Sequence, residues 1–129
     1  MSTAQATTNG VSVEVHARYA PDHSAPHQGH WFFLYTVLIR NGGDETVQLL
    51  ARHWIITDAT GKVEEVRGPG VVGEQPQLQP GEAFEYTSGC PLGTPWGRMH
   101  GRYEMRTANG ARFHAEIPAF ELRQPSALH

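Results

Sequence analysis

Residues 98–117 read RMHGRYEMRTANGARFHAEI, and this stretch decides the fold class. Apolar and charged side chains alternate on both sides of an Asn-Gly pair at 109–110, which favours the tight turn of a β-hairpin. A period of two residues is typical of strands with one buried and one exposed face. The stretch therefore predicts two paired strands, with Met99, Tyr103 and Met105 on the buried face.

The same reasoning extends outward along the chain. Residues 11–19 alternate cleanly, whereas residues 31–41 are apolar on both faces, as expected of a central strand. Turn signals rich in Gly, Asn and Asp separate the segments, and no stretch has a convincing helical period. We expect the third strand to be broken or bulged near residues 51–52. The predicted strands are 11–19, 31–41, 46–57, 62–66, 82–88, 98–107 and 111–117. We expect a long loop over 68–81 and a turn-rich segment over 89–97.

Seven short antiparallel strands indicate an all-β protein, an immunoglobulin or fibronectin type III-like β-sandwich. Cys90 is the only cysteine, so the intersheet disulfide of antibody domains cannot form, which favours the fibronectin-like variant. A small barrel is the alternative. Trp54 fits the core tryptophan of such sandwiches. The 129 residues fit one domain over 11–123, with a disordered N-terminal tail over 1–10 and a C-terminal tail over 124–129.

The composition excludes several classes of protein. Ten Lys and Arg against thirteen Asp and Glu give a net charge of −3, so a basic groove for nucleic acid is not the global design. The first nine residues lack the basic and apolar regions of a secretory signal. The longest apolar stretch, 31–39, is too short to cross a bilayer. We therefore expect a soluble cytoplasmic protein that does not bind membranes.

Four segments of the chain resemble the ApaG family. They read VQLLARHWIITD at 47–58, VEEVRGPGVVGEQP at 63–76, PGEAFEYTSGCPL at 80–92 and IPAF at 117–120. The resemblance implies a fibronectin-like sandwich. It also implies a link to cobalt resistance and magnesium efflux, because mutants in the family show these phenotypes, and a gene beside that of a diadenosine tetraphosphate hydrolase. The family has no established catalytic residues, so none is carried over to this chain.

The segment 68–73 fits the pattern G-x-G-x-x-G through Gly68, Gly70 and Gly73. In a dinucleotide fold this pattern must open a helix, but Pro76 and Pro80 would fall in its first turns. A Rossmann site is therefore not expected. Two alternatives remain open: an anion-binding nest of backbone amides, or glycines that only shape a long loop. We favour this loop as part of a partner-binding surface.

A cationic stripe is predicted on the exposed face of the 98–117 hairpin. The outward-facing residues are Arg98, His100, Arg102 and Arg106 on the first strand and Arg112 and His114 on the second, against Glu104 and Glu116. Arg67 precedes the glycine loop. Such a stripe can meet an anionic ligand or an acidic partner. The alternative is a solvated sheet face with weak cross-strand ion pairs.

Two other groups of residues carry little chemistry. His23, His27 and His30 share one loop, and three imidazoles suit Co²⁺, Ni²⁺ or Zn²⁺, but no helix holds them on one face. A solvated loop is the favoured interpretation, so no metal site is assigned. Cys90 lies between Gly89 and Pro91 with no base paired to it in the sequence, which indicates a structural thiol.

The sequence as a whole favours a non-enzymatic protein-interaction module that needs no cofactor and binds an unidentified protein partner. The alternative is a small-anion or nucleotide-binding protein that holds phosphate-type groups in the 68–73 loop. A metal-dependent hydrolase is the weakest hypothesis, since no paired carboxylates are visible. Trp31 and Trp96 add more apolar surface than one core needs, and a homodimer interface is one use for it.

Overall fold

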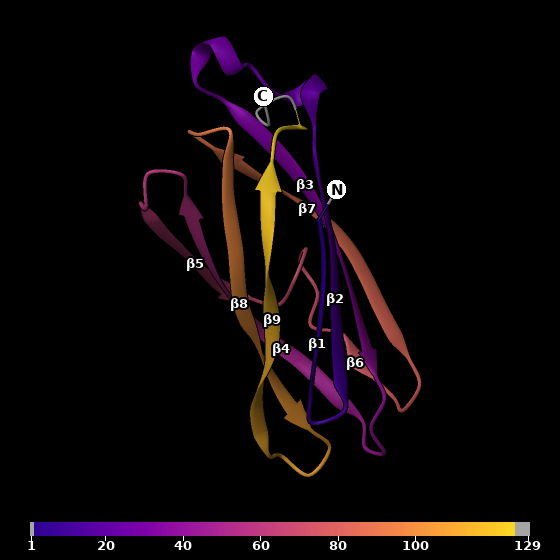
Figure 1. The fold of residues 1–129 in the computed structure, drawn as a ribbon. Helices are drawn as coiled ribbons and strands as arrows, with labels where there is room; N and C mark the ends of the chain where they lie inside the picture. The colour runs from indigo at the N-terminus through magenta and orange to yellow at the C-terminus, as the bar shows by residue number, and fades with distance from the viewer. Residues whose placement is uncertain (1, 126–129) are drawn as a thin grey trace.

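The computed structural model describes residues 2–125, which form two antiparallel β-sheets packed on each other as a sandwich (Figure 1). One sheet has the strand order β1-β2-β3-β7, and the other has the order β5-β4-β8-β9 with β6 added to β4. The strands are β1 (Ser2–Thr8), β2 (Val11–Tyr19), β3 (Trp31–Asn41), β4 (Val47–Asp58), β5 (Val63–Pro69), β6 (Gln77–Leu78), β7 (Ala83–Leu92), β8 (Trp96–Thr107) and β9 (Arg112–Arg123), and the single 3₁₀ turns η1 (Pro21–His23) and η2 (Pro26–Gln28) lie between β2 and β3.

The predicted fold class is confirmed, and each of the seven predicted strands has its counterpart in β2–β5 and β7–β9. The β8–β9 hairpin turns at residues 108–111, as the Asn-Gly pair indicates. β4 has an irregular register between Leu49 and Ala51, beside the predicted bulge. No helix in residues 2–125 is long and apolar enough to cross a membrane. A cytoplasmic location stays a prediction.

The core lies between the sheets and is centred on Trp54, which is 2% exposed. Its ring meets Tyr35 edge-on at 5.2 Å and Phe120 at 5.9 Å between centroids, so it joins both sheets. The expected inward residues of β8, Met99, Tyr103 and Met105, are fully buried. The hydroxyls of Tyr86 on β7 and Tyr103 on β8 form a hydrogen bond of 2.5 Å that joins the two sheets.

The prediction of a disordered tail over residues 1–10 is wrong. Ser2–Thr8 form β1, which pairs with β2 in unbroken register. The side chains of this segment are small and mostly polar, so its hydropathy pattern does not indicate a strand. Backbone hydrogen bonds pair it with β2 without needing apolar side chains. Two hydroxyls also reach the other sheet, because Thr8 accepts a hydrogen bond from the Glu116 N–H and Ser2 accepts one from the Glu121 N–H. β1 thereby closes one side of the sandwich against β9.

Two connections are shorter than predicted. The segment 89–97, expected as a turn-rich loop, mostly continues β7 and β8 and leaves a turn at residues 93–95. Pro91 fits there because β7 is an edge strand, where a missing N–H costs no ladder bond. Part of the long 68–81 loop is likewise strand, since β5 runs to Pro69 and β6 lies at 77–78.

The C-terminal tail predicted over 124–129 begins with an anchored residue. Gln124 donates its N–H to the carbonyl of Pro95 at 2.9 Å and accepts a hydrogen bond from the Trp31 indole at 2.9 Å. The indole N–H of Trp31 thus has a partner within the domain. Residues 126–129 lie outside the described residues.

Candidate functional site

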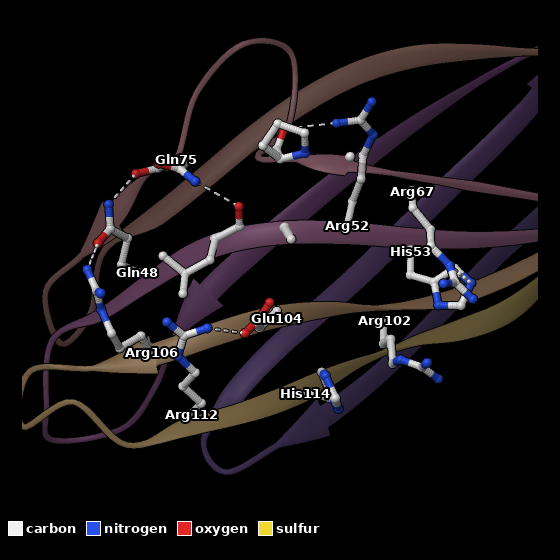
Figure 2. Close-up of a pocket in the computed structure, with 14 residues that line it drawn as sticks. Gln48, Arg52, His53, Arg67, Gln75, Arg102, Glu104, Arg106, Arg112 and His114 are labelled. Atoms are coloured by element: carbon white, nitrogen blue, oxygen red, sulfur yellow. Dashed lines mark hydrogen bonds and ion pairs between the residues drawn. The ribbon is translucent and has the colours of Figure 1, made fainter.

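A groove of about 780 Å³ lies along the β5-β4-β8-β9 sheet (Figure 2). The strand register explains which side chains share its floor. His53 on β4 pairs with Arg67 on β5 and with Arg102 on β8, which places all three in one row across the sheet. The lining residues are Gln48, Leu50, Ala51, Arg52, His53, Arg67, Gly68, Pro69, Gln75, Arg102, Glu104, Arg106, Arg112 and His114.

The charge of the groove is strongly positive. It is lined by five arginines and a single carboxylate, Glu104, although the whole chain has a net charge of −3. Figure 2 shows Arg106 and Arg112 toward one end, with Arg67 and Arg102 toward the other. A concentration of one sign of charge in a concave surface attracts ligands of the opposite sign.

Arg106 and Arg112 are direct cross-strand neighbours in the β8–β9 register. Like charges directly opposite each other destabilise a sheet. Arg112 Nη1 is held by Glu104 Oε2 at 2.6 Å, and Arg106 Nη2 donates to Gln48 Oε1 at 3.0 Å. Glu104 therefore pairs with Arg112 but not with Arg106, and the two arginines together keep an excess of positive charge.

A chain of amides joins this end of the groove to the loop after β5. Gln48 Nε2 donates to the carbonyl of Gln75 at 3.1 Å, and Gln75 Nε2 donates to the carbonyl of Leu50 at 2.9 Å. Because Gln48 also accepts from Arg106, the loop fixes the position of that guanidinium (Figure 2). The groove is thus built partly before any ligand arrives.

Arg102 is an exposed arginine in the same row as His53 and Arg67. Within residues 2–125 it makes no hydrogen bond or ion pair, although His53 and Glu116 are its register partners on β4 and β9. An arginine presents five N–H donors in a planar fork that matches a carboxylate or phosphate. Arg102 therefore has its whole donor set available to a ligand.

At the other end, His53, Glu65 and Arg67 form a small network. Glu65 Oε1 lies 2.7 Å from His53 Nε2 and 3.2 Å from Arg67 Nη2. These two contacts, the histidine hydrogen bond first, lower the pKa of Glu65. The carboxylate is therefore firmly ionised, and it neutralises part of the charge of Arg67.

The head of Arg52 lies against Gly68. Its Nη1 donates to the carbonyls of Pro69 and Gly70, each at 3.0 Å, so the guanidinium lies against the β5 backbone. A Cβ at Gly68 would stand 2.9 Å from Arg52 Nη2. Gly68 thus makes room for an arginine head.

The remaining part of the G-x-G-x-x-G motif is a tight hairpin. Gly70 has φ +59°, and a Cβ there would lie 2.1 Å from the carbonyl oxygen of Glu74. The N–H of Gly70 donates to Leu50, while Val71 and Glu74 exchange both of their backbone hydrogen bonds. These amides are engaged in the fold. The geometry supports the loop-shaping interpretation of the glycines over an amide nest for phosphate.

The structure brings together four of the seven predicted binding residues. Arg67, Gly68, Arg102 and Arg106 line the groove. Arg98 does not, because it lies toward the far end of β8, opposite Thr57 and Glu121. Gly70 and Gly73 also lie outside the lining.

The groove also contains Arg112, which belongs to the predicted cationic stripe, and Arg52, which the sequence did not place in it. The alternation along 111–117 indicates Arg112, because it faces outward on the strand that pairs with β8. No local signal reveals Arg52, which depends on the bulged register of β4.

The other sequence candidates stay apart from the groove. His23, His27 and His30 are exposed around η1 and η2, and no cluster of three potential metal ligands exists in residues 2–125. Cys90 is 3% exposed, and burial raises the pKa of its thiol to about 12. A buried neutral thiol agrees with the structural interpretation of this cysteine.

The fold and the groove together define an all-β sandwich with a strongly cationic sheet face. A sequence profile of the ApaG domain matches residues 21–107. The chain therefore belongs to the ApaG domain family.

Curated relatives and solved structures agree with this assignment. Protein ApaG of Parvibaculum lavamentivorans is 57% identical over 122 residues, which cover 95% of this chain and 94% of the relative. Protein ApaG of Acidithiobacillus ferrooxidans is 52% identical over 119 residues, 92% of this chain and 94% of the relative. The crystal structure of the putative ApaA protein from Bordetella pertussis has a TM-score of 0.87 at 52% identity, covering 89% of this chain and 94% of that chain.

Proposed function

We propose that this protein is a non-enzymatic binding module whose arginine groove receives an acidic segment of a protein partner. The observation that carries the proposal is the like-charge pair of Arg106 and Arg112 in a groove with five arginines and one carboxylate. A sheet under selection for stability alone favours opposite charges at such positions. Guanidinium forks bind carboxylates bidentately, which matches aspartate and glutamate side chains.

The chemistry of the groove supports binding over catalysis. A carboxyl group that works as a general acid near neutral pH has a raised pKa, whereas Glu65, which lies beside the groove, has a lowered one. Arginine keeps its proton at neutral pH and so does not serve as a proton donor. Cys90 is buried, and its raised pKa keeps it protonated. The groups at hand attract and hold an anion.

The second candidate is a small phosphate-type anion bound by the same arginines. Arg102 favours this candidate. Its N–H donors have no partner within residues 2–125, and phosphate oxygens bind a planar guanidinium as carboxylates do. For this candidate the anion binds on the sheet face and not in the 68–73 loop. The Gly70 and Val71 amides of that loop already donate to the carbonyls of Leu50 and Glu74.

Affinity capture from the native cell tests the proposal. The bait variant Arg102→Glu with Arg106→Glu reverses the groove charge, and Arg18→Glu with Arg98→Glu makes the same change in net charge elsewhere. We expect the wild type and the control pair to retain one partner that the groove pair loses. Equal recovery of that partner by both double variants would rule out the groove as its binding site.

Calorimetric titration of the wild type with pyrophosphate tests the second candidate. Under the favoured function it gives no heat of binding. A micromolar affinity that Arg102→Glu abolishes would favour the small-anion function instead.

A further inference from the structure

The outer edge of β5 is open. β5 is the last strand in the order β5-β4-β8-β9, and no other strand in residues 2–125 pairs with its far side. Each of its residues is exposed except the half-buried Gly68. Figure 1 shows β5 at the margin of its sheet. An unpaired strand of seven residues is a template for adding another strand.

The β4–β5 ladder determines which backbone groups face outward. Lys62 accepts a hydrogen bond from the Asp58 N–H, and the Gly70 N–H donates to Leu50, so residues of even number point toward β4. The β4–β5 register is unbroken between these points, and orientation alternates along a strand. The outward groups therefore belong to the odd-numbered residues Val63, Glu65, Arg67 and Pro69.

The sequence of β5 is complementary to itself in one antiparallel register. With Val66 placed on a two-fold axis, Glu65 lies opposite Arg67 of a second copy, and Arg67 lies opposite the Glu65 of that copy. Each of these pairs joins opposite charges on the groove face, where cross-strand ion pairs stabilise a sheet. On the axis, the two copies of Val66, a valine that is 38% exposed in one chain, meet each other.

The hydrogen bonds fit the same register. Glu65 and Arg67 of the two copies can exchange both of their backbone bonds, and the Val63 N–H can donate to the carbonyl of Pro69. Pro69 has no N–H to leave unpaired, and it lies at the end of the ladder. Neighbouring registers are worse, because centring on Glu65 or on Arg67 places that residue opposite its own copy.

We propose that a second copy of this chain adds to β5 in this register, forming a homodimer with one continuous sheet across the two-fold axis. Such an interface is isologous, since the same patch serves on both sides. A single strand pair buries less than a standard interface, so the dimer is concentration-dependent. Arg67 also lines the groove, so the grooves of the two copies meet at the axis and offer a doubled surface to a partner.

Sedimentation equilibrium of the full-length protein, without any ligand, tests the dimer. The wild type should pass from monomer to dimer as concentration rises. Glu65→Arg places only arginines in the pairs across the axis, and Arg67→Glu places only glutamates there. We expect each variant alone to be monomeric, with a circular dichroism spectrum like that of the wild type.

An equimolar mixture of the two variants is the decisive sample. Each pair across the axis would then join an arginine of one chain to a glutamate of the other, so a heterodimer should form. Arg102→Glu with Arg106→Glu leaves β5 intact and should dimerise like the wild type, which separates this proposal from the proposed function.

A wild type that stays monomeric at about 1 mM would overturn the proposal. So would single variants that dimerise as the wild type does, or a mixture that stays monomeric.

Discussion

Arg106 and Arg112 lie directly opposite each other on β8 and β9, with Glu104 bound to Arg112 and Gln48 bound to Arg106. The fold therefore keeps two like charges at neighbouring positions on an exposed sheet face. The cost to stability is of the order of several tenths of a kcal/mol. A cost of this kind is expected where positive charge serves binding.

Arg106→Gln should stabilise the protein. The change removes the repulsion from Arg112 and keeps an amide that can still donate to Gln48. We expect a gain of about 0.2–1 kcal/mol at low salt that fades at high salt, because exposed charges are screened. Urea unfolding at two salt concentrations measures this. A loss of stability, or a gain that is independent of salt, would contradict the repulsion.

Alanine should destabilise the protein more at Gly70, in the glycine loop, than at Gly61. Gly61 and Gly70 both have positive φ, but a Cβ at Gly61 meets nothing within 4 Å, whereas one at Gly70 would lie 2.1 Å from the Glu74 carbonyl oxygen. Gly61→Ala should cost about 1 kcal/mol for its backbone conformation alone. Gly70→Ala should cost about 3 kcal/mol or more, because the hairpin must also open. Equal losses in urea unfolding would show that the close approach is not what requires glycine at 70.

The His53–Glu65–Arg67 network predicts a pH dependence. Because folding lowers the pKa of Glu65, the network adds stability at pH values above the ordinary glutamate pKa, and this is lost as pH falls through the lowered value. His53→Ala removes the largest cause of the shift. We expect the Glu65 side-chain carbon signal to titrate at higher pH in this variant, as followed by NMR. An unchanged Glu65 titration would mean that the histidine contact is not the main cause.

Much of the fold could be predicted from the sequence because the signals are local. Alternation along 98–117 predicts which residues of β8 face the core, and the Asn-Gly pair predicts the β8–β9 hairpin in which Arg106 lies opposite Arg112. The apolar 31–41 stretch correctly indicates a central strand, since β3 pairs with both β2 and β7.

The positions of β1 and Arg52 depend on contacts between residues that are distant in the sequence. β1 has only a weakly apolar inner face, on which Ala4 packs against the core, and it is held by backbone pairing with β2 and by two hydroxyls that reach β9. Arg52 joins the groove because its head lies on Gly68, a contact between positions sixteen residues apart that only the β4–β5 register explains. Of the glycine motif only Gly68 lines the groove, and it lies against the Arg52 guanidinium.

We expect the arginines of the groove, and not the amides of the glycine loop, to bind the anionic ligand. NMR titration of ¹⁵N-labelled protein with a short polyglutamate peptide tests it most directly, since arginine Nε–H signals and backbone amides are observed in one sample. We expect the Nε–H signals of Arg102, Arg106 and Arg112 to shift, and the Nε–H signal of Arg98 to stay where it is. Shifts confined to the backbone amides of residues 70–73, with the groove arginines unmoved, would contradict it.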